Sequence, residues 1–333
     1  MDKVFERHLL EMARHILAAW HLPDPELRLI AYRENAVFAV YALGQRSALR
    51  LHRPGYMSEA AVRSELDWLR ALTSVGVPVP LPMPTSDGNY LVSLEENGGS
   101  RHASMLTWVD GIALGRSNAP LHWGQRDLAK IFHAIGSGMA NLHRESDAWA
   151  RPQGFQRHAW DAEGLLGEMP LWGRFWDGAR LDRHQSNQLR SLRDRIAEHM
   201  TAMKGLDYGL IHADIVRENV LVDGSTVQFI DFDDAGFGWR LFDLATALLP
   251  NLDEPNAPMI CRQLLEGYRS RRPLADLDLL PMFLVLRALT YVGWFSSRPE
   301  VDPTGSRLAR HIERALRLAE RWQAGWSPAG ACK

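Results

Sequence analysis

Apolar residues in the first part of the chain follow two different spacings. Residues 5–20 place their apolar positions at helical spacing, and Pro23 and Pro25 end this predicted helix. Three short apolar or alternating runs follow between turn residues, at 27–30, 37–41 and 48–51. We therefore expect one helix followed by a small antiparallel sheet.

A second helix begins after Ser58, whose hydroxyl is suited to cap the first turn, and its apolar residues lie on one side. The alternating prolines of residues 78–84 predict an extended connector. This connector leads to strands at 90–94 and 105–109. Beyond the last of these strands, helical spacing prevails as far as Trp322.

A polar loop interrupts this helical part of the chain. Short apolar strands at 210–211 and 220–222 flank the loop, and Asp223-Gly224 is a strong turn signal before another apolar run at 227–230. The loop is therefore expected to be held in place between strands.

Four polar residues in and after this loop carry the strongest chemical signal. They are His212, Asp214, Asn219 and Asp231. Each residue type alone is common in ordinary turns, because its side chain satisfies local backbone groups. In phosphoryl transfer from a metal nucleotide, one carboxylate receives a hydroxyl proton while an amide and a second carboxylate hold magnesium against the phosphates. The four residues at these spacings predict a kinase.

The motif His-x-Asp-x-x-x-x-Asn, followed by Ile-Asp-Phe-Asp-Asp, resembles the aminoglycoside phosphotransferase and choline kinase superfamily. Its bacterial branch includes homoserine kinase-like and stress-response kinase-like enzymes. The resemblance covers nearly the whole chain and implies an α+β, protein kinase-like two-lobe fold with a small antiparallel-sheet N-lobe and a larger, mainly helical C-lobe. It places a nucleotide-covering lobe at 1–107, a hinge at 108–111, a helical lobe at 112–328 and a tail at 329–333.

The resemblance implies a role for each residue of the motif. Asp214 matches the catalytic base, and Asn219 and Asp231 match the magnesium ligands of an enzyme that uses ATP and Mg²⁺. His212 matches the histidine that organises the catalytic loop, and it is taken with Asp214 as part of the catalytic pair. Asp243 matches a buried acid that anchors the backbone of this loop.

The N-terminal lobe carries weaker signals for the nucleotide. Arg50 stands where the superfamily usually has a phosphate-binding lysine, and Glu65 matches its acidic partner, with Glu59 as the alternative. Asn35 lies in a loop that matches the phosphate-covering loop but contains no glycine. Thr107 and Val109 match the strand and hinge whose backbone groups bind the adenine edge.

The acceptor is expected to be the hydroxyl of a small molecule. Only a short stretch separates Asp231 from Asp243, which leaves no room for a peptide-binding activation segment, and Ala213 replaces the arginine that would bind a phosphate there. Candidate substrate contacts are Asp233, Asp234 and Arg217. Tryptophans between Trp149 and Trp176, most of them packing residues, could contribute a wall for a cationic or amino-bearing acceptor. Homoserine, a sugar, an aminoglycoside and another amino alcohol all remain open.

Composition fits an enzyme of the cytoplasm. The chain of 333 residues is 46% hydrophobic, enough for about two domains, and its net charge of −2 argues against a nucleic-acid partner. Arg287 stops the apolar run 282–286, so we expect no membrane span, and Cys261 and Cys332 give no disulfide framework. The alternatives are a stress-response type Ser/Thr protein kinase, a non-catalytic nucleotide sensor and, more distantly, a metallohydrolase using His212, Asp214 and Asp231.

Overall fold

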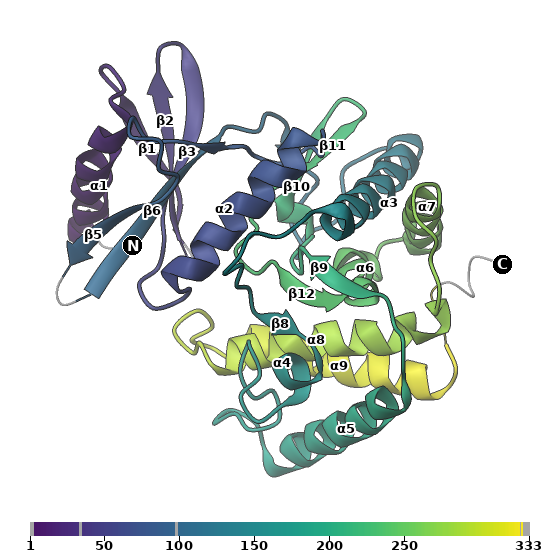
Figure 1. Cartoon of the computed structure of the whole chain (residues 1–333). Coiled ribbons are helices and arrows are strands. Elements are labelled where there is room, and N and C mark those ends of the chain that lie inside the picture. Colours follow the sequence, from purple (N-terminus) through teal and green to yellow (C-terminus); the bar gives the residue numbers. More distant parts are fainter. Residues whose placement is uncertain (1–2, 33–34, 97–98, 327, 329–333) are drawn as a thin grey trace. The chain divides into compact units, whose positions relative to one another are not determined.

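The computed structural model describes residues 3–32, 35–96, 99–326 and 328, and its elements form two compact units (Figure 1). The first unit comprises Met1–Gly111, Trp149–Arg157 and Gln228–Ile230. The second unit comprises Ile112–Ala148, His158–Val227 and Asp231–Lys333. Cys332 lies outside the described residues, as do Arg33 and Glu34 of the expected phosphate-covering loop.

An antiparallel sheet of six strands forms the centre of the first unit. Its order is β1-β2-β3-β6-β4, with β5 paired to β6. The strands are β1 (Glu26–Tyr32), β2 (Ala36–Ala42), β3 (Gln45–Leu51), β4 (Pro82–Met83), β5 (Val92–Glu96) and β6 (Gly99–Thr107). The expected antiparallel sheet is confirmed. Within the proline-rich connector, Pro82 starts the edge strand β4, where a missing N–H group is tolerated.

The first unit also contains two helices. Helix α1 (Lys3–Leu17) precedes β1 and continues as a 3-10 turn to Trp20, and helix α2 (Glu59–Ser74) lies between β3 and β4 in the sequence. The apolar face of α1 packs on the sheet, where Leu9 and Ile16 share one core with Phe38, Leu49 and Met105 (Figure 1). Fully burying one such side chain stabilises the fold by about 1.5–3 kcal/mol. The expected cap of α2 is present, since the Ser58 hydroxyl accepts the Ala61 N–H at 3.2 Å.

The second unit is mainly helical. Its helices are α3 (Gln125–Ala148), α4 (Ala162–Leu166), α5 (Arg183–Ala202), α6 (Arg240–Leu248), α7 (Ala257–Arg269), α8 (Leu280–Ser296) and α9 (Ser306–Gln323). Helices α3 and α7 approach each other closely at two glycines. A Cβ atom at Gly136 would lie 1.9 Å from the Leu264 carbonyl oxygen, and one at Gly267 would lie 2.0 Å from the His133 carbonyl oxygen.

Two small sheets hold the polar loop that the sequence predicts. One sheet has the order β8-β12-β9 and contains β8 (Ala159–Trp160), β12 (Gly236–Trp239) and β9 (Tyr208–Ile211). The other has the order β11-β10-β7 and contains β11 (Thr226–Phe229), β10 (Val220–Asp223) and β7 (Ile112–Ala113). The loop runs from the end of β9 to the start of β10, as expected.

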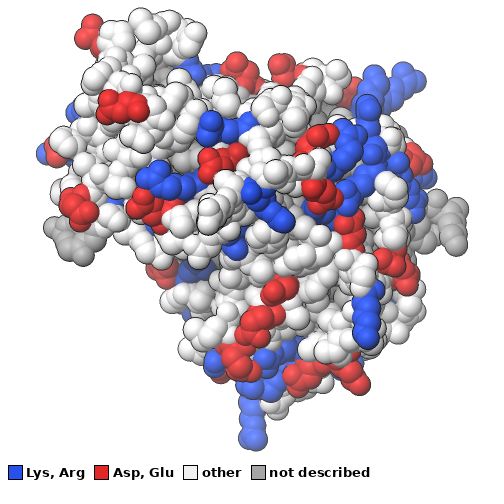
Figure 2. All heavy atoms as spheres, viewed as in Figure 1, with Lys and Arg blue, Asp and Glu red and all other residues white. Residues whose placement is uncertain are grey.

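Helix α8 forms the interior of the second unit. Among the described residues, Leu277–Ser296 is the one helical segment that is long and apolar enough to cross a membrane. The core helix of a globular unit has the same properties, and 78% of this window is buried inside the protein. On the face shown in Figure 2, acidic and basic side chains are interspersed.

Candidate active site

The backbone of the loop between β9 and β10 is fixed by one buried carboxylate. Asp243, at 0% exposure in the first turn of α6, accepts the Ala213 N–H at 2.8 Å and the His212 N–H at 3.1 Å. Ala213 has a φ of +63°, a left-handed conformation that non-glycine residues rarely adopt. The two hydrogen bonds offset the strain of this turn and hold the next residue, Asp214, in place.

Asp243 belongs to a buried hydrogen-bond chain that crosses three helices. Its Oδ2 atom lies 2.9 Å from Nε2 of His143, and Nδ1 of His143 lies 2.8 Å from the Tyr268 hydroxyl. Burial and the nearby Arg240 guanidinium lower the pKa of His143 to about 4. Neutral His143 therefore donates from Nε2 to Asp243 and accepts the Tyr268 proton at Nδ1, a tautomer assigned from this network.

His212 organises the loop from within. Its side chain is buried, its ring centroid lies 4.3 Å from that of Phe232, and its Nδ1 atom accepts the Asp214 N–H at 3.3 Å. These contacts occupy one ring nitrogen with the backbone of the neighbouring acid. This geometry supports a positioning role for His212.

The Asp214 carboxylate is held by one donor on each oxygen. Its Oδ1 atom accepts a hydrogen bond from Nη2 of Arg287 at 2.6 Å, and its Oδ2 atom accepts one from Nδ2 of Asn219 at 2.8 Å. One fifth of the Asp214 side chain remains exposed, at 20%. Burial raises the pKa of Asp214, while the Arg287 charge and these hydrogen bonds oppose the rise. A fixed, partly accessible carboxylate of this kind can receive a proton from a hydroxyl group.

The two expected metal ligands lie in the second unit and differ in exposure. Asn219 is 7% exposed, and its amide nitrogen also donates to the Asp214 carbonyl oxygen at 3.0 Å. These bonds use the nitrogen, so the amide oxygen is the atom suited to a hard cation. Asp231 is exposed and has a left-handed φ of +68°. Within the described parts of the chain, no cluster of three His, Cys, Asp or Glu side chains suits a metal.

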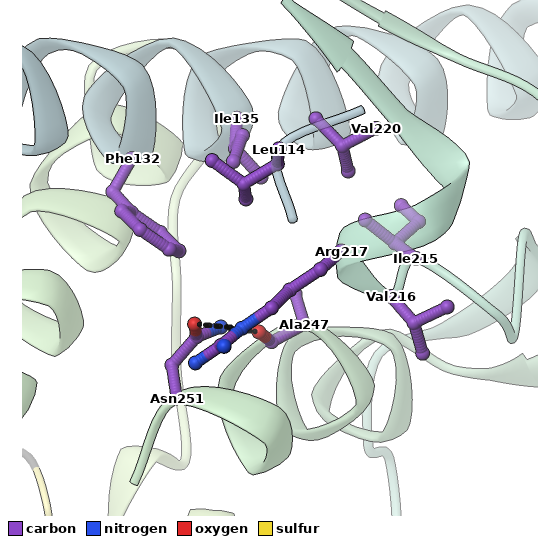
Figure 3. Close-up of a pocket in the computed structure, with 9 residues that line it drawn as sticks. All are labelled: Leu114, Phe132, Ile135, Ile215, Val216, Arg217, Val220, Ala247 and Asn251. Atoms are coloured by element: carbon purple, nitrogen blue, oxygen red, sulfur yellow. Dashed lines mark hydrogen bonds between the residues drawn. The ribbon is translucent and has the colours of Figure 1, made fainter. Parts of the chain in front are cut away.

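The contacts of Arg217 argue against the substrate role that the sequence suggested. The side chain is buried, and its donors are used by Asn251 Oδ1 at 2.9 Å, Glu254 Oε1 at 2.6 Å, and the carbonyl oxygens of Ala119, Pro250 and Arg116 at 2.6, 2.7 and 3.2 Å. Figure 3 shows Arg217 pointing at Asn251 in a small hollow lined mainly by apolar side chains. Arg217 therefore ties the loop between β9 and β10 to the segment after α6, which favours a structural role for this side chain.

Asp234 lies close to aromatic residues of the second unit. Its backbone carbonyl accepts the indole N–H of Trp160 at 2.8 Å, and its Oδ1 atom accepts that of Trp172 at 3.3 Å. Trp160 and Trp176 are almost fully buried packing residues. Asp233 is half-buried beside Asp234. Among the tryptophans of this unit, Trp172 therefore best fits the expected acceptor wall.

Sequence reasoning gave no role to Arg287, which the structure places against Asp214. It lies in the middle of α8, has 0% exposure and forms the ion pair with Asp214. Its guanidinium carbon lies 4.6 Å from the ring centroids of both Trp172 and Tyr291. The available signal was a single charge within an otherwise apolar helix. From the sequence alone, that charge argued only against a membrane span.

In the first unit, the ion pair expected between Arg50 and Glu65 is present. Nη2 of Arg50 lies 2.7 Å from Oε1 of Glu65, and both side chains are buried. Arg157 approaches the other oxygen of Glu65 at 3.6 Å. Glu59 instead pairs with Arg63 at the surface, so Glu65 is the partner of Arg50. Burial and the Arg50 charge lower the pKa of neighbouring His52 well below its ordinary value.

The remaining nucleotide candidates also lie in the first unit. Asn35 is buried, and its Oδ1 atom accepts the Arg53 N–H at 3.1 Å. The Thr107 N–H donates to the Leu81 carbonyl oxygen at 2.8 Å, so this donor is already used within the sheet. Of the two hinge candidates, Val109 is therefore better suited to offer its N–H to a base.

Comparison with known proteins places these residues in a family. The model of the phosphotransferase enzyme family matches residues 26–277. The structure of the microcompartment-associated aminopropanol kinase has 32% sequence identity and a TM-score of 0.80, over 95% of this chain and 98% of that one. An amicoumacin kinase in complex with AMP-PNP and Ca²⁺ has the same fold, with 19% identity and a TM-score of 0.77 over 97% of this chain and 94% of that one.

A homoserine kinase of Agrobacterium fabrum (strain C58 / ATCC 33970) is 28% identical over 224 residues, which cover 65% of this chain and 63% of that protein. These relatives support phosphotransfer from ATP to a small-molecule hydroxyl. They favour a small-molecule kinase over the protein kinase alternative. The expected two-lobe, protein kinase-like fold is also confirmed. The chain belongs to the phosphotransferase enzyme family and is a small-molecule kinase.

Proposed function

We propose that this kinase uses magnesium and ATP to phosphorylate the hydroxyl group of a small amino alcohol of the aminopropanol class. The observation that carries the proposal is the Asp214 carboxylate, fixed by Arg287 and Asn219 and still 20% exposed. The acceptor class is supported by 32% identity to the aminopropanol kinase over 95% of this chain.

Asp214 has the role of proton acceptor in this proposal. The acceptor hydroxyl oxygen forms a bond to the γ-phosphorus while the bond from that phosphorus to the bridging oxygen of ADP breaks. The hydroxyl proton passes to Asp214, and ADP leaves with the electron pair of the broken bond. His212 and Asp243 act indirectly, since they hold the loop that presents Asp214.

Asn219 and Asp231 would hold the magnesium ion. The Asn219 nitrogen is bonded to Asp214, so its oxygen is the ligand atom, and Asp231 supplies an exposed carboxylate. Oxygen ligands of this type suit Mg²⁺, which usually retains water and takes further oxygens from phosphates. When bound, magnesium neutralises charge on the phosphates. Two protein ligands are therefore sufficient.

The first unit supplies the nucleotide contacts in this proposal. Arg50, oriented by Glu65, would bind phosphate oxygens through its guanidinium. Asn35 would contribute from the loop between β1 and β2. Val109, and to a lesser extent Thr107, would meet the base through backbone groups of the hinge.

An amino group on the acceptor fits the charges near Asp214. Asp234 accepts the Trp172 indole N–H, Trp172 packs against Arg287, and Arg287 binds Asp214. This series of contacts brings a second carboxylate to the same region as the proposed base. An ammonium group could pair with Asp234, with Asp233 beside it, while the acceptor hydroxyl faces Asp214.

An ADP-release assay with magnesium tests the acceptor class directly. Aminopropanol and propanediol form a matched pair, because they share a carbon chain and differ in the amino group. We expect aminopropanol to be the better acceptor by about 10-fold or more in kcat/KM, the effect of one charge-assisted hydrogen bond. Equal activity with both compounds would contradict recognition of an amino group.

Homoserine is the second candidate acceptor, since the Agrobacterium homoserine kinase is 28% identical over 65% of this chain. Homoserine carries an amino group and a carboxylate as well as the hydroxyl. A higher kcat/KM for homoserine than for aminopropanol would select this candidate. A sugar, an aminoglycoside and a protein substrate complete the panel. ADP release with only one of these three would reject both aminopropanol and homoserine as the acceptor.

A further inference from the structure

Arg287 occupies a cage of aromatic rings inside the second unit. Its guanidinium carbon lies 4.6 Å from the ring centroids of Trp172 and Tyr291 and 5.8 Å from that of Phe242. Cation–π attraction favours a cation at such distances. The protein's own arginine therefore occupies this cage, of which Trp172 alone belongs to the tryptophans expected to form an acceptor wall.

The guanidinium makes only part of its possible hydrogen bonds. Nη2 donates to Asp214 Oδ1 at 2.6 Å and to the Tyr291 hydroxyl at 3.2 Å. The Nε and Nη1 atoms are buried and have no hydrogen-bond partner among the residues that the structure describes. Burial of a charged group with unsatisfied donors is unfavourable, and an apolar side chain would fill such a site at less cost. Stability therefore does not explain an arginine at this position.

Function gives a better explanation, because Arg287 and Asn219 together fix the Asp214 carboxylate. Each donor binds a different oxygen, at 2.6 and 2.8 Å, so the plane of the carboxylate is set from both sides. Rigid rings pack against Arg287, and Asn219 lies on the 3-10 turn Arg217–Asn219. Neither donor can easily follow a rotation of the Asp214 side chain.

We propose that Arg287 is a positioning residue for phosphoryl transfer, which holds the Asp214 carboxylate in the orientation that receives the acceptor proton. The proposal rests on the proposed role of Asp214 as the base. It predicts that loss of the guanidinium slows the chemical step and leaves nucleotide binding nearly unchanged. Orientation errors of about 1 Å can reduce a catalysed rate by about 100-fold.

The single-turnover rate of phosphoryl transfer from magnesium-ATP is the decisive measurement. We expect Arg287→Met to lower this rate by about 100-fold and Arg287→Lys to lower it by about 10-fold, because lysine keeps the charge without the planar fork. The dissociation constant for magnesium-ATP should change by less than about twofold, since nucleotide binding does not use this residue. A rate within about twofold of wild type in folded Arg287→Met, or in Arg287→Lys where the Met variant does not fold, overturns the proposal.

Arg298→Lys is the matched control. Arg298 follows the same helix and stacks on Trp294, with 4.8 Å between its guanidinium carbon and the ring centroid. The substitution thus replaces an arginine that also stacks on a tryptophan but takes no part in the ion pair with Asp214. Its single-turnover rate should match that of the wild type, and an equal loss in both lysine variants would show that the effect is not specific to Arg287.

A double variant separates this inference from the proposed role of Asp214. If Arg287 acts through Asp214, Asp214→Asn with Arg287→Met should be no slower than Asp214→Asn alone. Fully additive losses would show that Arg287 acts elsewhere and would overturn the inference, while the base would stand. Normal turnover in Asp214→Asn alone would instead reject the base itself.

Discussion

His143 in α3 donates its Nε2 hydrogen to Oδ2 of Asp243 in α6 across 2.9 Å. The same carboxylate accepts the backbone N–H groups of His212 and Ala213. The conformation of the catalytic loop therefore depends on a histidine that is distant in sequence. This histidine must be neutral for its other nitrogen to accept the Tyr268 hydroxyl proton.

We expect this network to make the protein less stable in mild acid. Burial lowers the pKa of His143 from 6.5 to about 4, so the unfolded chain binds a proton more readily than the folded one. This contribution to stability is complete above pH 6.5 and is lost as the pH falls toward 4. The loss of unfolding free energy at the lower pH amounts to about 3 kcal/mol for this single group.

Denaturant unfolding at several pH values measures this effect. In His143→Gln, the unfolding free energy should decrease less between neutral and acid pH than it does in the wild type. His184→Gln is the control, because His184 is exposed on α5 and should leave the decrease unchanged. Identical pH dependence in wild type and His143→Gln would contradict the assignment of a neutral buried histidine.

Arg217→Lys tests the structural role of Arg217, which lies in the loop between β9 and β10. Arg217 is buried and donates to Asn251, Glu254 and several carbonyl oxygens, so removal of its fork should reduce the unfolding free energy by about 3–5 kcal/mol. The acceptor KM of the folded variant should stay within about twofold of wild type, because no donor is available for a substrate. A large rise in acceptor KM with unchanged stability would restore the substrate role.

Arg50→Ala tests the proposed phosphate contact in the first unit. A lost charge-assisted hydrogen bond of about 1.5–3 kcal/mol corresponds to a decrease of about 10- to 100-fold in kcat/KM for ATP. Arg50→Lys should recover only part of the loss. Arg63→Ala breaks the exposed pair with Glu59 and should have little effect. If Arg50→Ala and Arg63→Ala behave alike, another cation, such as Arg53, must position the phosphates.

Asp231→Asn tests the proposed magnesium site. Loss of a carboxylate ligand should weaken magnesium-ATP binding by about 10-fold or more. When magnesium is chelated, wild type and Asp231→Asn should bind ATP with the same affinity. Asp233→Asn is the matched control, because Asp233 has a proposed acceptor role and should retain nucleotide affinity. Equal calorimetric affinities for wild type and Asp231→Asn would remove Asp231 from the metal site.

Local spacing explains why part of the site could be predicted from sequence. Asp214 and Asn219 lie five residues apart, and their hydrogen bond forms within one loop. The Arg287 ion pair joins residues 73 positions apart, so only the folded chain reveals it. The structural contacts of Arg217 could not be predicted for the same reason, since its partners Asn251 and Glu254 follow 34 and 37 residues later.

The fold shows a similar limit. The strands β1, β2 and β3 were visible because apolar runs and turn residues define them locally. The short strands β8 and β12 were missed, since each depends on pairing with a distant segment. β12 also contains two glycines, Gly236 and Gly238, which weaken any local strand signal.

The turnover number of Asp214→Asn, measured with saturating magnesium-ATP and the best acceptor, tests the central claim most directly. The asparagine keeps the size of the side chain and removes the proton acceptor. We predict a decrease of about 100-fold or more in kcat, with nucleotide affinity nearly constant and the fold retained. A folded Asp214→Asn enzyme with a kcat close to that of the wild type would contradict the assignment of Asp214 as the catalytic base.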